Sequence, residues 1–127
     1  DLAQADMIVL PGGMPGTTNL YADKRVTSAV RAMYDAEKYV AAICAAPSVI
    51  LGGMGLLKGR RATCYPGMED GREGAEAVPA TCVTDGTIIT ACGVGGALDF
   101  ACALITALIS REKADEIALS VVYHAAN

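Results

Sequence analysis

Short apolar runs alternate along the chain with stretches whose apolar residues recur at helical spacing. The runs are four to six residues long and enriched in β-branched residues, which is typical of buried strands in a parallel sheet. They lie at residues 6–10, 40–43, 61–65 and 87–92. Helices are predicted at residues 23–37, 47–54, 97–109 and 110–123. This alternation predicts a three-layer α/β/α sandwich with a mostly parallel sheet and helices on both faces.

Local signals refine this pattern. Asp23 is placed to cap the first predicted helix, and Ser110 is placed to cap the last. Asp85 and Gly86 lie between two strand-like runs, which predicts a β-hairpin. The third predicted helix is apolar on all sides apart from Asp99, so we expect it to be largely buried.

The run VAAICAAPS at residues 40–48 joins the end of a strand to the start of a helix. Pro47 suits the first turn of a helix, so Cys44 is expected on the sharp turn between the two elements. The free N–H groups and the dipole at a helix start favour a thiolate, and the small Ala45 and Ala46 leave room for a substrate. The pattern predicts a nucleophile elbow with cysteine in the place of serine. The alternative is a buried cysteine that acts as a small hydrophobic residue.

Two glycine turns are expected at the same edge of the sheet as Cys44. Gly12 and Gly13 follow the first strand and begin a loop that runs to Thr18, and residues 93–96 follow the last strand. In parallel sheets, ligands bind beyond the carboxyl ends of the strands. Three such features at one edge predict a site there.

Composition excludes several classes of function. The 127 residues and 13.0 kDa suit one domain, residues 1–127. The net charge of −4, without any cluster of lysine and arginine, argues against nucleic acid or a membrane surface as a partner. Five cysteines without a CxxC pair argue against a disulfide scaffold and a zinc site, and favour a reducing cytoplasm. The longest apolar run, residues 100–109, is too short to span a bilayer.

Several motifs together carry a resemblance to a known family. They are IVLPGG at residues 8–13, AAICAAP at 41–47, DG at 85–86, ITACGVGGALDF at 89–100 and REKA at 111–114. With these motifs, which extend over nearly its whole length, the chain resembles the ThiJ/PfpI family, also described as class I glutamine amidotransferase-like. The resemblance implies a flavodoxin-like α/β sandwich that is often a homodimer.

The resemblance also implies a site. It makes Cys44 the nucleophile and makes the backbone N–H groups of Gly13 and Ala45 the donors to a bound oxyanion, where negative charge develops on a carbonyl oxygen. Further residues expected to line the site are Gly12, Tyr65 and Gly93. It implies neither a cofactor nor a metal.

Members of the family are glyoxalases, deglycases, peptidases, chaperones or oxidation sensors, so three functions stay open. The first is a cysteine-dependent enzyme acting on a small carbonyl substrate or a glycated protein. The second is an oxidative-stress sensor or chaperone that uses oxidation of Cys44, and the third is a peptidase-like or amidase-like hydrolase.

Three departures from the family pattern bear on catalysis. The family's first strand and helix, with a glutamate that hydrogen-bonds the cysteine sulfur, have no counterpart after Asp1. Tyr65 stands where many relatives have a histidine, and Gly-Val-Gly-Gly at residues 93–96 replaces Gly-Pro-Gly-Thr. We therefore expect an N-terminal fragment of the same protein to accompany this chain, because without its first strand the sheet keeps unpaired edges and folds poorly.

The remaining ionisable residues are expected to have structural or surface roles. His124 is expected at an exposed end of the chain. Asp99 is expected to cap its helix or to meet a dimer partner. The acidic residues Glu69, Asp70 and Glu73 are expected to form a solvated loop.

Overall fold

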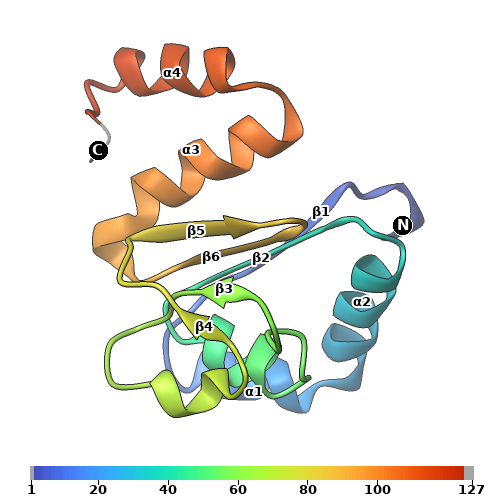
Figure 1. The fold of residues 1–127 in the computed structure, drawn as a ribbon. Helices are drawn as coiled ribbons and strands as arrows, with labels where there is room; N and C mark the ends of the chain where they lie inside the picture. Colours follow the sequence, from blue (N-terminus) through green and yellow to red (C-terminus); the bar gives the residue numbers. More distant parts are fainter. Residues whose placement is uncertain (1, 125–127) are drawn as a thin grey trace.

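The central sheet has four strands and is parallel apart from one edge (Figure 1). The computed structural model describes residues 2–124. The strands are β1 (Met7–Leu10), β2 (Tyr39–Ile43), β5 (Cys82–Asp85) and β6 (Ile88–Ala91). Their order is β1-β2-β6-β5, and only β5 runs antiparallel to its neighbour. The predicted hairpin is confirmed, since β5 and β6 are joined at Gly86, whose φ of 61° suits a tight turn.

The register brings the three predicted site segments to one edge. Leu10 pairs with Ala42, and Ile43 pairs with Ala91. The chain therefore leaves β1, β2 and β6 at the same level, and the residues that follow these strands lie beside one another. This confirms the expected edge of the sheet.

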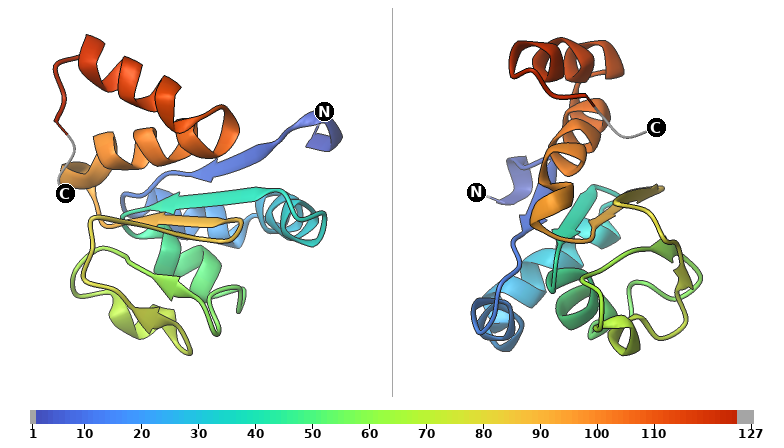
Figure 2. Two further views of the ribbon diagram at one scale, coloured as in Figure 1. Left: turned by 45° about the horizontal axis from the view of Figure 1, so that its top comes forward. Right: turned by 90° about the vertical axis from the view of Figure 1, so that its left-hand side faces the viewer.

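Helices cover both faces of the sheet (Figure 2). One face carries α1 (Gly16–Ala22), α2 (Lys24–Asp35) and the π-helix η2 (Pro47–Gly52). The other face carries α3 (Ala97–Leu108), and α4 (Arg111–Ser120) packs on the outer side of α3. Three 3-10 turns complete the helices: η1 (Leu2–Gln4), η3 (Glu69–Arg72) and η4 (Val94–Gly96).

Both predicted N-caps are confirmed. The Asp23 carboxylate accepts a hydrogen bond of 2.9 Å from the Arg25 N–H at the start of α2. The Arg25 side chain also donates to this carboxylate and holds its pKa low, at about 2. The Ser110 hydroxyl accepts from the Lys113 N–H at the start of α4.

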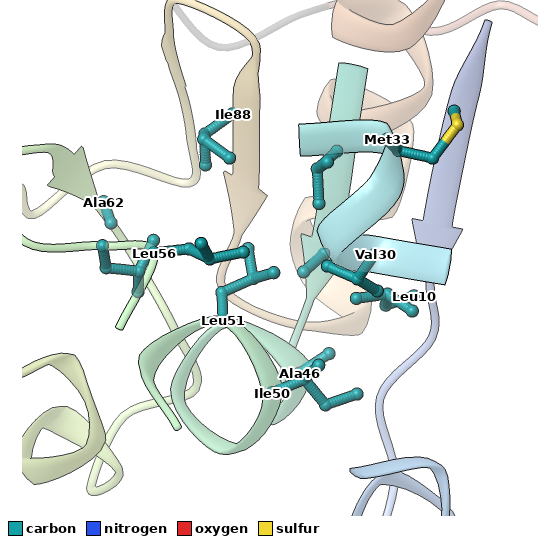
Figure 3. Close-up of a cluster of buried hydrophobic side chains, with 12 residues drawn as sticks. Leu10, Val30, Met33, Ala46, Ile50, Leu51, Leu56, Ala62 and Ile88 are labelled. Carbon is teal, nitrogen blue, oxygen red and sulfur yellow. The ribbon is translucent and has the colours of Figure 1, made fainter. Parts of the chain in front are cut away.

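The larger core lies between the sheet and the face that carries α1, α2 and η2. Figure 3 shows Ala46 and Ile50 of this helical segment directed toward Leu10 of β1 and Val30 of α2. These side chains are almost fully buried. Burial of aliphatic side chains is the main stabilising contribution available to this chain, which has few aromatic residues. The segment that follows Cys44 is therefore anchored in the core.

Several sequence-based expectations differ from the structure. The helix over 97–109 was expected to be largely buried, but within α3 only Phe100 is buried, while Leu98 and Leu108 are 51% and 47% exposed. The sheet can cover one side of α3 only, and α4 covers part of the rest. An all-apolar pattern shows that a helix has no polar face, but it does not supply a second layer.

Two further segments differ from their expected secondary structure. The stretch expected as a loop up to Thr18 includes the start of α1. The strand expected at 61–65 is only β3 (Arg61–Ala62), and it pairs in parallel with β4 (Glu76–Ala77) in a small separate sheet. Short elements such as these depend on pairing between distant residues, which a local pattern does not reveal. Within residues 2–124, no helix is long and apolar enough to cross a membrane.

One buried hydrogen bond joins the small sheet to the large one. The Thr63 N–H, which follows β3, donates to the Thr90 hydroxyl of β6 at 3.0 Å, and Thr90 is fully buried. Thr90→Val keeps the shape of the side chain but leaves a buried donor without its acceptor. We expect it to lower the free energy of unfolding by about 1–3 kcal/mol in urea denaturation.

Thr84→Val is the matched control for this prediction, because Thr84 lies on the neighbouring strand with its side chain exposed. It should change the free energy of unfolding by less than about 0.5 kcal/mol. Equal stabilities for the two variants would contradict the assigned role of the Thr63–Thr90 bond.

Candidate active site

Cys44 follows the last residue of β2 and has a left-handed backbone conformation, with φ at 66°. Its N–H donates to the Ala91 carbonyl at 2.9 Å, and its carbonyl accepts from the Tyr65 N–H at 2.8 Å. Non-glycine residues rarely adopt this conformation, which costs about 1–2 kcal/mol. The expected sharp turn is present, and hydrogen bonds to two separate segments hold it. The Cys44 side chain is half-buried.

Gly12 packs directly on this turn. A Cβ atom at Gly12 would lie 2.4 Å from the Cys44 Cβ, 2.8 Å from the Ile43 carbonyl oxygen and 3.2 Å from the Ala45 nitrogen. The first two distances are too short for a real Cβ atom, and the third is tight. The absence of a side chain at Gly12 is what allows the loop after β1 to touch Cys44.

Gly13 and Ala45 lie on the two segments that meet at this contact. Gly13 has a φ of 87° and open space where a side chain would stand, and its carbonyl accepts from both the N–H and the hydroxyl of Thr17. Within residues 2–124, neither the Gly13 nor the Ala45 N–H donates to a protein acceptor. Two such amides on the segments that meet at the Cys44 turn suit the binding of an oxyanion.

The helix after Cys44 is a π-helix and not the regular helix expected over 47–54. Pro47 occupies its first turn as expected. Such π-segments are frequent at functional sites. The buried Ser48 donates to the Met68 carbonyl at 2.6 Å, and a Cβ at Gly52 would lie 1.7 Å from the Gly71 carbonyl oxygen. The loop that contains η3 is thus packed tightly on this helix.

Tyr65 and Gly93 form the remaining part of the predicted site. The Tyr65 ring lies against Gly93, since a Cβ there would be 3.5 Å from the ring carbon Cδ2. The ring is half-exposed, and the Tyr65 N–H holds the Cys44 carbonyl. The structure therefore brings together all six predicted residues at one edge of the sheet.

Sequence reasoning missed three residues that hold this arrangement. They are Thr17, which fixes Gly13, Ser48, which fixes the loop at Met68, and Thr90, which fixes Thr63. Thr17 had a local signal, because a threonine four residues after a glycine turn can bond back to it. The partners of Ser48 and Thr90 are distant in sequence and have no local signal.

The other four cysteines are also free thiols. Cys64 is buried, and the other three are half-buried. Burial raises the pKa of the Cys82 thiol to about 11, with further contributions from the Asp99 carboxylate and from Cys92. Cys82 is therefore a neutral thiol at pH 7.

The structure also places the ionisable residues for which the sequence predicts structural or surface roles. Asp99 accepts a hydrogen bond from the Tyr123 hydroxyl, a partner that the sequence did not suggest. His124 is exposed, as expected, and so are Glu69, Asp70 and Glu73. Among the described residues, no group of three or more potential ligands is placed to hold a metal ion.

The contact between Gly12 and Cys44 makes a direct prediction. Gly12→Ala must displace either the turn or the loop, so we expect it to lower the free energy of unfolding by about 1–3 kcal/mol and to slow alkylation of Cys44. Gly16→Ala is the control, because nothing lies within 4 Å of a Cβ at Gly16. The contact would be refuted if both variants kept the stability of the parent chain and its rate of Cys44 alkylation.

Known proteins resemble this chain in sequence. The profile of the DJ-1/PfpI family matches residues 1–107. Protein DJ-1 homolog A from Arabidopsis thaliana is 40% identical over 120 residues, which cover 88% of this chain and 29% of that protein. A deglycase from Pyrococcus horikoshii is 38% identical over 88 residues (67% of this chain, 51% of that protein). Isonitrile hydratase from Pseudomonas putida is 31% identical over 125 residues (97% and 54%).

Solved structures resemble it in fold. A DJ-1 superfamily protein from Salmonella typhimurium matches with a TM-score of 0.90 and 35% identity, over 98% of this chain and 70% of that one. Oxidized DJ-1 from Toxoplasma gondii matches with a TM-score of 0.91 and 32% identity, over 98% and 68%. These matches confirm the flavodoxin-like fold.

The chain spans only part of these relatives. It covers 29% of the plant protein and about half of the deglycase and the hydratase. The family profile nevertheless matches most of this chain, including the Gly12 turn, the Cys44 turn and the Gly93 turn. The chain belongs to the DJ-1/PfpI family.

Proposed function

We propose that the protein is a cofactor-independent enzyme that acts on reactive carbonyl compounds through Cys44. The observation that carries the proposal is the strained turn at Cys44, where the missing side chain of Gly12 lets the loop that contains Gly13 pack against the turn that contains Ala45. Backbone strain of this kind is retained where the surroundings impose it, and it is concentrated at functional sites.

The chemistry follows from the arrangement of donors. The Cys44 sulfur adds to the aldehyde carbon of a 2-oxoaldehyde, a C–S bond forms, and the carbonyl electron pair moves to oxygen. The N–H groups of Gly13 and Ala45 then stabilise this oxyanion. Transfer of hydrogen from the aldehyde carbon to the neighbouring ketone carbon gives a thioester, and water releases a 2-hydroxy acid. The aldehyde carbon is oxidised and the ketone carbon reduced, so no external oxidant or reductant is needed.

The relatives support carbonyl chemistry and also a second candidate. A deglycase is among them, which favours early glycation adducts and methylglyoxal as substrates. Oxidized DJ-1 from Toxoplasma gondii has nearly the same fold, which favours oxidation of Cys44 as an alternative function. In that alternative, the same amides stabilise a sulfinate on Cys44. The hydratase relative keeps a hydrolase-like reaction as a third candidate.

Turnover of methylglyoxal separates these functions. We expect the complete protein to form lactate. Cys44→Ser and Cys44→Ala should lose at least about 100-fold in kcat/KM, because a hydroxyl is a far weaker nucleophile than the thiol and a methyl group is not a nucleophile. Cys102→Ser is the control. Cys102 lies on α3, and this variant should retain activity. The complete protein is used because this chain spans only part of its relatives.

Equal rates for the parent protein and Cys44→Ser would contradict the proposal. Absence of turnover together with peroxide oxidation confined to Cys44, read by peptide mass spectrometry, would support the sensor function. Oxidation spread evenly over all five cysteines would contradict the sensor function as well.

A further inference from the structure

A cavity of about 470 Å³ is lined in part by Cys64 and Pro66, the residues on either side of Tyr65. Thr63, Cys64 and Pro66 form one wall, and Cys92 and Thr81 belong to the other. A volume of this size is in the range of small-molecule sites. The chemistry described above does not use this cavity.

Residues next to both walls of the cavity form main-chain hydrogen bonds with Cys44. Tyr65, which lies between Cys64 and Pro66, donates its N–H to the Cys44 carbonyl at 2.8 Å. Ala91, which precedes Cys92, accepts the Cys44 N–H at 2.9 Å. The cavity therefore begins one residue away from each hydrogen-bond partner of Cys44.

The Tyr65 ring contacts the segment that contains the other wall. It lies against Gly93, the residue after Cys92, and it is 50% exposed. A side chain at Gly93 would touch the ring and narrow the space between the two walls. The cavity thus adjoins two residues of the candidate site, because its lining includes both chain neighbours of Tyr65 and the residue before Gly93.

The lining shows which chemical groups fit. The lining is largely apolar and includes Val78, Pro79 and Ala80, and Thr63 and Thr81 are its neutral polar residues. Among the residues whose side chains the structure describes, Glu69 is the charged residue in the lining. An apolar or cationic group is therefore compatible with the lining, and an anionic group is repelled.

We propose that this cavity is the specificity subsite of the Cys44 centre and that it binds the apolar or aromatic substituent of a 2-oxoaldehyde larger than methylglyoxal. This deepens the carbonyl function proposed above and rests on it for the identity of the substrate. Whether the cavity affects access to Cys44 depends on its lining residues alone, so the subsite can be tested without turnover.

The test uses two variants of the lining and two reagents. Ala80→Phe fills the cavity, and Val78→Ala widens it. Alkylation of Cys44 in the complete protein is followed by peptide mass spectrometry with iodoacetamide and with N-benzyl iodoacetamide, in which the sulfur displaces iodide. The ratio of the two rates reports how well Cys44 accepts a reagent with an aromatic substituent.

We expect Ala80→Phe to lower the ratio of the N-benzyl iodoacetamide rate to the iodoacetamide rate about tenfold. Val78→Ala should raise this ratio, because a pocket discriminates by the apolar group it can hold. Ala32→Phe, which adds the same ring on the exposed side of α2, should leave the ratio unchanged. If both lining variants fold and their rate ratios stay within twofold of the ratio for the unsubstituted protein, the subsite is refuted. If Ala80→Phe fails to fold, Val78→Ala decides the question alone.

A parallel assay distinguishes this proposal from the function on which it rests. Ala80→Phe should lower kcat/KM for phenylglyoxal about tenfold relative to kcat/KM for methylglyoxal. Absence of turnover for both substrates in the parent protein would refute the carbonyl function, and the alkylation ratios would still decide whether the subsite exists.

Discussion

The left-handed conformation of Cys44 is the constraint on which the rest of the structure depends. A φ of 66° is costly for cysteine, and it persists because hydrogen bonds from β6 and from the Tyr65 segment hold the peptide on both sides. The helix that follows cannot relax the turn, because Ala46 and Ile50 are fixed in the core. The fold thus uses its packing to hold one side chain at the carboxyl edge of the sheet.

This constraint also explains where the neighbouring segments lie. Gly12 fits against Cys44 only because it has no Cβ, and Gly13 follows it on the same loop. The Tyr65 segment is both a hydrogen-bond partner of Cys44 and one wall of the cavity. Gly12 and the Tyr65 segment, which forms part of the cavity wall, therefore both contact a single turn, the one at Cys44.

Sequence reasoning predicted the features that depend on local chemistry. The strand-to-helix turn at Cys44, the cap at Asp23 and the hairpin at Gly86 each have their signal within a few residues. It did not predict the exposure of α3 or the hydrogen bond of Ser48, because both depend on what other elements cover or reach. The six residues of the candidate site came largely from family resemblance. Their close approach, above all the contact of Gly12 with Cys44, required the fold.

The central claim is that the turn makes Cys44 the reactive thiol of this protein, and the alkylation rates of its five cysteines at pH 7 test it most directly. With limiting iodoacetamide and site-resolved mass spectrometry, Cys44 should react fastest. Cys82 should be among the slowest, because its raised pKa of about 11 keeps it protonated until the pH approaches that value. Reaction of Cys44 no faster than that of Cys82 would contradict the account.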